Sequence, residues 1–226
     1  MHLPDVAGVL AVCAHPDDES FGLGAILHAF GERGAKSAVL CFTHGEASTL
    51  HDVAGDLGAV RGAELTAAGT HLGVQHVDVL DYPDGTLAAE RVEGLAAHVV
   101  GAARDVGADA LLVFDHGGVT GHPDHQAATD AAIAAADELD LLVLAWAIPT
   151  AIADALNAEF GTAFVGRDPD ACDIVLDVDR SAQLAAIRCH ASQSSTNAVL
   201  RRRLELQRNT ECLRVLRPRS AHGWST

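Results

Sequence analysis

A histidine and three acids stand together near the start of the chain, in the run AHPDDES at residues 14–20. Acids in the first turn of a helix are favourable on their own, by roughly 0.3–1 kcal/mol each, because they face the positive end of the helix dipole. That explains the acids but not His15 beside them. Imidazole nitrogen and carboxylate oxygen are common zinc ligands, and a catalytic zinc site keeps one position open for water. The run therefore indicates either a capped helix or a metal site in which one carboxylate binds the ion and its neighbour accepts a proton.

A second cluster, TGHPDH at residues 120–125, carries two histidines around a Pro-Asp pair. Pro123 favours the first position of a helix, so we expect His122 in the loop and His125 in the first turn. Asp124 would cap this helix or hold the His122 imidazole in one tautomer. Two His-Pro-Asp stretches together predict a divalent metal site. Their spacing leaves the ligands open among three histidines and four acids.

The elements around these clusters predict a doubly wound α/β fold, because apolar runs alternate with helical stretches as in βα units around a parallel sheet. Both clusters follow apolar runs, and ligands in such sheets bind beyond the carboxyl ends of the strands. The expected strands are 6–14, 36–42, 76–80, 110–114, 141–147 and 174–178, and the expected helices are 19–31, 56–72, 89–106, 124–139, 180–190 and 197–206. We expect a single domain over residues 1–226, with residues from about 150 to 226 as a less regular C-terminal elaboration.

Composition limits the class of protein. Of 226 residues, 49% are hydrophobic and 20% charged, which indicates a globular chain, and the formal net charge is −16. Such an acidic surface repels phosphate backbones and anionic lipids, so neither nucleic acid nor membrane is an expected partner. No apolar run reaches the ~20 residues that cross a bilayer. The N-terminal run has no secretory-signal pattern, and the five cysteines predict no disulfide scaffold, so we expect a cytoplasmic protein.

One basic stretch contrasts with this acidic background, with arginines at positions 201–203, 208, 214, 217 and 219. We interpret it as a solvated helix face followed by a tail. The alternative is a site for an anionic ligand or an interface in a homo-oligomer.

The two clusters, AHPDDE after the first strand and GHPDH after the fourth, strongly resemble the LmbE/PIG-L family of metal-dependent deacetylases. Shorter runs, THGE at 43–46, RGAE at 61–64, DYPDG at 81–85 and HASQ at 190–193, resemble the family's T-x-G-E, R-x-x-E, D-G and H-x-S-Q elements. The resemblance covers about residues 6–195, with His44 where the family often has arginine. It implies a Rossmann-like three-layer fold and hydrolysis of an acetamide on an N-acetylglucosamine-type amino sugar.

Carried over position by position, the resemblance implies that His15, Asp18 and His125 bind the metal. Zinc is the expected ion, and ferrous iron also suits a His₂Asp site.

The resemblance also implies roles for the residues around the metal. Asp17 would be the general base, and His122 would stabilise the oxyanion or act as general acid, with Asp124 behind it. Arg61 and Asp84 would contact sugar hydroxyls. Independently of the resemblance, we interpret His190 as either a substrate contact or a cation at the C-terminal end of a helix.

Three rival interpretations remain. The same groups would suit an amidase for another amide, such as a thiol conjugate. A nucleotide-binding module is faintly suggested by Gly22-Leu23-Gly24, although the acids of that loop would repel a pyrophosphate. A metal-binding interaction protein without catalysis would have no use for the base and the acid that are both present.

Overall fold

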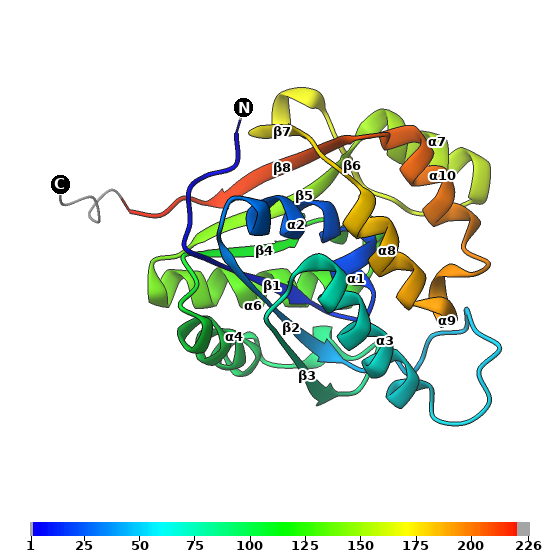
Figure 1. Ribbon diagram of the computed structural model, residues 1–226, viewed down its shortest axis with the longest axis horizontal. Coiled ribbons are helices and arrows are strands. Elements are labelled where there is room, and N and C mark those ends of the chain that lie inside the picture. The colour runs from blue at the N-terminus through cyan, green and yellow to red at the C-terminus, as the bar shows by residue number, and fades with distance from the viewer. Residues whose placement is uncertain (1, 221–226) are drawn as a thin grey trace.

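The computed structural model describes residues 2–220, except for the side chain of residue 118, and an eight-stranded sheet forms its centre (Figure 1). The strands are β1 Gly8–Cys13, β2 Lys36–Thr43, β3 His76–Tyr82, β4 Ala110–Phe114, β5 Leu142–Pro149, β6 Gly166–Arg167, β7 Ile174–Asp177 and β8 Thr210–Arg217. Five strands pair in parallel in the order β3-β2-β1-β4-β5, and β8 and then β7 extend the sheet in antiparallel pairing. The short β6 pairs with β5 off this path.

Helices cover both faces of the sheet (Figure 1). They are α1 Asp18–Phe21, α2 Gly24–Glu32, α3 Leu57–Leu72, α4 Val92–Val106, α5 Gly118–Gly121, α6 Pro123–Leu139, α7 Thr150–Phe160, α8 Ser181–Cys189, α9 Ala191–Ser194 and α10 Ala198–Gln207, with 3₁₀ turns η1 Leu87–Ala89 and η2 Pro169–Ala171. Side chains along a strand alternate between faces. Val9 and Ala11 of β1 join the core under α2, α3 and α8, whereas Leu10 and Val12 join the core over α4 and α6. The predicted three-layer α/β fold is confirmed.

The predicted helix over residues 19–31 is interrupted. It consists of α1 and α2, which are separated at Gly22 and Leu23. A Cβ atom at Gly22 would lie 2.6 Å from Phe114 and 2.8 Å from Trp146, so the chain passes too close to these rings for any side chain there. The interruption therefore brings the loop that follows β1 against the ends of β4 and β5.

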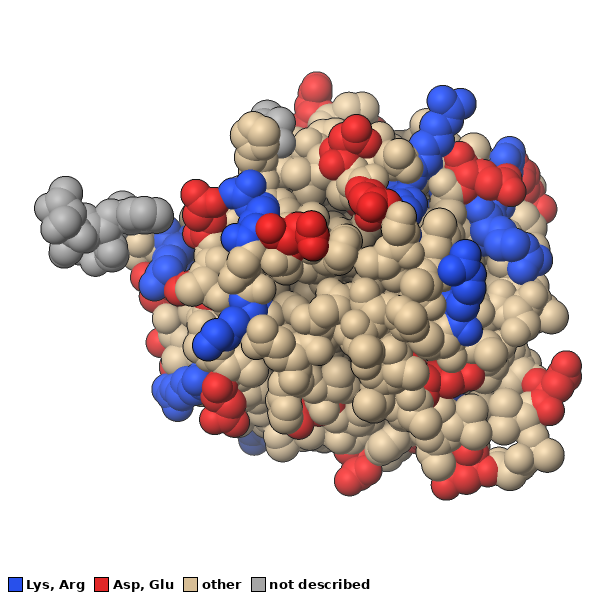
Figure 2. Space-filling model, viewed as in Figure 1, with Lys and Arg blue, Asp and Glu red and all other residues tan. Residues whose placement is uncertain are grey.

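The segment predicted as an arginine-rich tail is instead the strand β8, between β5 and β7. Its arginines and those around it make ion pairs with acids from other elements: Arg202 with Glu159, Arg214 with Asp115, Arg217 with Asp137 and Asp140, and Arg219 with Asp109. On the face of the molecule in Figure 2, basic and acidic side chains are interspersed around an uncharged centre. No described helix is both long and apolar enough to serve as a transmembrane span.

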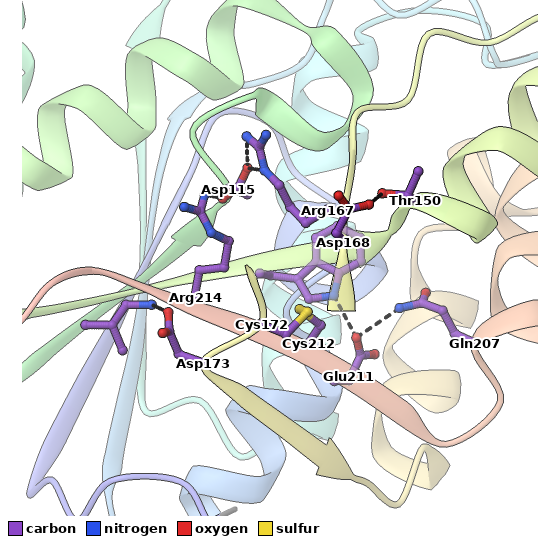
Figure 3. Close-up of a disulfide and its surroundings, with 12 residues drawn as sticks. Asp115, Thr150, Arg167, Asp168, Cys172, Asp173, Gln207, Glu211, Cys212 and Arg214 are labelled. Carbon is purple, nitrogen blue, oxygen red and sulfur yellow. Dashed lines mark hydrogen bonds and ion pairs between the residues drawn. A yellow bond between two sulfur atoms is a disulfide. The ribbon is translucent and has the colours of Figure 1, made fainter. Parts of the chain in front are cut away.

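A disulfide also departs from the sequence-based expectation. Cys172, which precedes β7, is bonded to Cys212 of β8 (Figure 3). Near it, Asp115 at the end of β4 accepts hydrogen bonds from Arg167 and Arg214 at 2.6 Å each. The prediction of a reducing cytoplasm rested on a chain without disulfides, and this bond removes that support.

Candidate active site

The two His-Pro-Asp clusters meet beyond the carboxyl ends of β1 and β4. His15 Nδ1 lies 3.2 Å from His125 Nε2, although the two residues are 110 positions apart. His125 Nε2 lies 3.1 Å from Asp18 Oδ1, and His15 Nδ1 lies 4.0 Å from Asp18 Oδ2. A tetrahedral ion with ligand bonds of about 2.0–2.1 Å holds its ligand atoms roughly 3.3 Å apart. All three residues are buried, and their atoms therefore fit a zinc-sized ion.

Each of these side chains is also oriented through its other polar atom. Asp18 Oδ2 accepts hydrogen bonds from two backbone N–H groups of the preceding loop, at 3.0 Å each. Thr120 Oγ1 lies 3.0 Å from His125 Nδ1. His15 Nε2 lies 3.0 Å from Asp84 Oδ1, although it makes no aligned hydrogen bond. Such outer contacts fix the tautomer and the direction of metal-binding imidazoles, so they leave His15 Nδ1 and His125 Nε2 for an ion.

Asp124 does not stand behind His122 in the way the sequence predicts. Its carboxylate accepts hydrogen bonds from the N–H groups of Gly85 (2.8 Å) and Leu87 (3.1 Å), and it lies 3.4 Å from His15 Nε2. The contact with His122 is made by the backbone instead, because the Asp124 N–H donates to His122 Nδ1 at 3.2 Å. The carboxylate thus anchors the D-G loop beside His15.

His122 is a hydrogen-bond donor in this arrangement. Since its Nδ1 accepts a hydrogen bond, the ring hydrogen of the neutral form is carried by Nε2. Burial and then the neighbouring imidazoles of His15 and His125 lower the pKa of His122 below its ordinary value. The lowered pKa favours the neutral ring, in which the hydrogen on Nε2 could be donated to a ligand.

Asp17 has an unusual backbone conformation, with φ 123° and ψ −22°. Strained residues of this kind cost about 1–3 kcal/mol and are found mainly at functional sites. Glu19 Oε2 accepts a hydrogen bond from the Asp17 N–H at 3.0 Å, and Arg61 Nη2 lies 2.9 Å from Asp17 Oδ2. Burial raises the pKa of Asp17 to about 6, against the opposing effect of Arg61. The carboxylate therefore changes protonation state near neutral pH.

Arg61, predicted to contact sugar, is a buried residue whose terminal nitrogens bond to the loops around it. Besides Asp17, they donate to the carbonyl oxygens of Gly45 and Pro16. Gly45 has a φ of +64°, and a Cβ there would lie 2.0 Å from Arg61 Nη1. Only glycine fits, which explains the glycine of the THGE run.

The HASQ run joins the C-terminal part of the chain to the earlier motifs. Three contacts do this: His190 Nε2 with Glu19 Oε1 (2.6 Å), Ser192 Oγ with Glu64 Oε2 (2.6 Å) and Ser48 Oγ with Gln193 Oε1 (2.7 Å). His190 is fully buried, so it is not a substrate contact. It lies at the C-terminal end of α8, and although burial alone would lower the pKa of its imidazole, the charge of Glu19 outweighs this and raises the pKa, as the alternative of a cation at a helix end predicts. The motif was visible in the sequence, but nothing in its spacing indicated these partners.

A cavity of about 760 Å³ opens over this cluster. Most of the predicted site residues line it: His15, Asp17, Asp18, Arg61, Asp84, His122 and His125. Asp124 is fully buried behind this wall. The structure thus gathers a metal-sized His₂Asp cluster, a carboxylate with a raised pKa and an imidazole donor in one cavity.

The doubly wound α/β fold thus holds, in one cavity, a buried His₂Asp cluster that could bind a metal ion. The chain belongs to the PIG-L family, because the sequence profile of that family, described as GlcNAc-PI de-N-acetylase, matches residues 10–136. The resemblance seen in the motifs is confirmed.

Similar proteins support this membership, and the matches differ in the share of each chain that they cover. The chain is 32% identical to a 1D-myo-inositol 2-acetamido-2-deoxy-alpha-D-glucopyranoside deacetylase of Mycolicibacterium vanbaalenii, over 85% of this chain and 83% of that protein. A protein of the same name from Kineococcus radiotolerans is 32% identical, but the match spans 56% of this chain and only 44% of the relative. The N,N'-diacetylchitobiose deacetylase of Pyrococcus horikoshii superposes with a TM-score of 0.71, at 21% identity and with 94% of this chain and 84% of that chain covered. At that identity the superposition shows the fold alone.

Proposed function

We propose that this protein is a deacetylase that hydrolyses the acetamide of an N-acetylglucosamine-type amino sugar or of a conjugate that contains one. The observation that carries the proposal is the joint presence of the His15–Asp18–His125 cluster and Asp17 in one cavity. Family membership and relatives named as deacetylases of acetylated amino sugars support the substrate class.

The residues that would hold the metal are His15, Asp18 and His125, and zinc is the ion that we propose. Two imidazoles and one carboxylate at these separations suit it, and ferrous iron is the second choice. A divalent ion bound there would polarise the amide carbonyl and lower the pKa of a coordinated water to about 7.

Asp17 would accept the proton of the attacking water. A base works best when its pKa lies near the working pH, and burial has raised the pKa of this carboxyl to about 6. Arg61 contacts the Asp17 carboxylate, and the Glu19 carboxylate accepts a hydrogen bond from the Asp17 N–H. Both contacts keep Asp17 in its strained conformation, in which it lines the cavity.

His122 would donate through Nε2 to the amide oxygen as negative charge develops on it. A donor fixed in advance stabilises an oxyanion better than mobile water does, because it needs no reorientation during the reaction. A neutral His122 has no proton to spare, so the proton that Asp17 accepts from the water would be the one passed to the departing amine. Arg61 and Asp84 would meet sugar hydroxyls from the opposite wall, although both already have partners within the protein.

The test is an assay of the purified protein loaded with zinc or with ferrous iron. Methyl N-acetylglucosaminide, N-acetylglucosaminyl inositol, diacetylchitobiose and an acetylated cysteine conjugate are offered, and released acetate and amine are measured. We expect release from at least one of the sugars. Release from the thiol conjugate alone would assign the rival amidase. Stoichiometric nucleotide binding without a bound metal would overturn the hydrolase proposal.

A further inference from the structure

The walls of the active-site cavity differ in chemistry from one side to the other. In the sheet, β1 has β2 and β3 on one side and β4 and β5 on the other. The loops after β2 and β3 supply the polar residues Ser48 and Asp84, together with Ala47 and Leu50. The strands β4 and β5 supply two aromatic residues, Phe114 and Trp146. Aromatic side chains of the lining therefore lie on the β4 and β5 side of the metal cluster, with polar residues such as Thr162 and Asn197 among their neighbours in the lining.

The aromatic side of the cavity begins directly at a proposed metal ligand. The Phe114 ring centroid is 4.6 Å from that of His125 and 5.0 Å from that of Trp146. Phe164, which follows α7, and Val199 and Leu200 of α10 complete this wall. We call these five residues, Phe114, Trp146, Phe164, Val199 and Leu200, the apolar arm. Because the arm adjoins the metal cluster, a group bound in it would be part of the substrate itself.

Two polar groups at the apolar arm, the indole N–H of Trp146 and the guanidinium of Arg203, already have partners within the protein. Trp146 Nε1 donates to Glu211 at 2.7 Å. The guanidinium of Arg203 lies 5.0 Å from the centre of the Trp146 ring, and its terminal nitrogens donate to Gln207 and to the Phe21 carbonyl oxygen. A substrate hydroxyl here would lose its hydrogen bonds to water and find few new partners, whereas an alkyl or aryl group has no such hydrogen bonds to lose.

The size of the cavity leaves room for such a group. Ligand pockets of roughly 300–1,000 Å³ take molecules of drug size, and this cavity of about 760 Å³ is in the upper part of that range. Resting on the proposed function, we propose that the apolar arm binds an apolar alkyl or aryl substituent that the acylated amino sugar carries close to its amide. This substituent is either an acyl chain longer than acetyl or an apolar group attached to the sugar.

Two substrate series separate these sources. One series keeps the methyl glycoside and lengthens the N-acyl group from acetyl to butyryl and hexanoyl. The other keeps the acetyl group and lengthens the glycoside from methyl to butyl and hexyl. Each buried methylene is worth about fourfold in affinity, so kcat/KM should rise by up to about fourfold per carbon in one of the series. A rise in the acyl series assigns the arm to the acyl chain, and a rise in the glycoside series assigns it to the sugar substituent. If kcat/KM is flat or falls in both series, the proposal is wrong.

A variant with a charge in the apolar arm tests whether a rise in kcat/KM with chain length depends on that arm. Val199→Asp should abolish the ratio of long-chain to short-chain kcat/KM. Val175→Asp is the matched control, because Val175 is 47% exposed on β7 and does not line the cavity. An unchanged ratio in Val199→Asp, with a Tm like that of the control, would overturn the assignment.

Binding distinguishes failure of this inference from failure of the proposed function. Calorimetry with the same compounds, below their micelle concentrations, measures Kd whether or not hydrolysis occurs. If Kd falls as the chain lengthens but no acetate is released, the deacetylase proposal is wrong and the assignment of the apolar arm is supported. If the compounds are hydrolysed but neither Kd nor kcat/KM depends on chain length, the deacetylase proposal is supported and the assignment of the apolar arm is wrong.

Discussion

Glu19 and His190 are 171 positions apart in the chain, yet their side chains meet at 2.6 Å and neither exposes any surface. The other carboxylate oxygen of Glu19 accepts a hydrogen bond from the N–H of Asp17. The contact therefore links the C-terminal HASQ run to the backbone of the proposed base. Glu19 is thus a positioning residue that lies behind the catalytic cavity.

Replacing Glu19 should lower turnover more than substrate affinity. In Glu19→Ala, the strained Asp17 backbone loses its acceptor, and we expect kcat to fall by about 10–100-fold, the usual effect of removing an outer support. We expect KM to change by less than about threefold, and Glu19→Gln, which keeps one oxygen, to recover part of kcat. Glu159→Ala, at an exposed surface pair, is the control. If Glu19→Ala and Glu19→Gln have the same Tm as the wild type and lose the same factor in kcat, the positioning role is contradicted.

Asp17→Asn should separate metal binding from catalysis. The amide keeps the shape of the carboxylate but cannot accept the proton, so we expect kcat to fall by roughly 10²–10⁴. Metal content, measured by atomic emission, should stay near that of the wild type. Near-normal kcat on a confirmed substrate would show that another group is the base.

Removing one imidazole of the cluster should remove the metal. His125→Ala leaves two ligand residues, so we expect loss of bound zinc and of activity that added zinc does not restore at stoichiometric concentration. In the wild type, zinc at 100 times its Kd should raise the stability by about 2.7 kcal/mol, and the variant should not respond. His76→Ala is the control, since His76 pairs with Asp78 at the surface. A thermal shift with zinc in His125→Ala would mean that the ion binds elsewhere.

The disulfide should contribute measurably to stability. Cys172 and Cys212 are separated by 40 positions, and closing a loop of this length is worth roughly 4 kcal/mol on the chain-entropy estimate, with native-state strain reducing it. Urea unfolding of Cys172→Ser in the absence of reductant should therefore show a lower free energy of unfolding than the wild type. Cys189→Ser, at a free and partly exposed cysteine, is the control. Equal stability of the two variants would mean that the bond adds nothing to the fold.

Asp115 should make part of the stability depend on pH in the acid range. Burial alone would raise the pKa of this carboxyl, but hydrogen bonds from Arg167 and Arg214 outweigh it and hold the pKa below the ordinary 3.8. A carboxylate with a depressed folded-state pKa contributes stability that is fully present above the unfolded-state value and is lost as pH falls through the folded-state value. The loss of stability in Asp115→Asn should therefore be constant from pH 7 to about 5 and should shrink below about pH 4. Exposed Asp154→Asn is the control, and a difference that grows toward low pH would contradict the argument.

The sequence by itself determined the five parallel strands of the sheet, the two loops at its edge and the residue types of those loops. Strand and helix periodicity is local, and the carboxyl ends of parallel strands lie at one edge, so the two His-Pro-Asp loops could be placed together from the sequence, whereas the choice of His15 and His125 as ligands came from the motif resemblance. The motif resemblance then separated Asp18 from Asp17. It also indicated a deacetylase, a class that the match to the family supports.

Tertiary structure alone decided which partner each polar atom of the site residues contacts. Asp124 holds the D-G loop and lies beside His15 instead of supporting His122, and Asp84 lies beside the same His15 nitrogen. The position of β8 in the sheet and the pairing of Cys212 were equally invisible from local patterns. These features depend on contacts between segments far apart in the chain. Spacing and propensity describe only neighbours in sequence, so the folded chain was needed to reveal them.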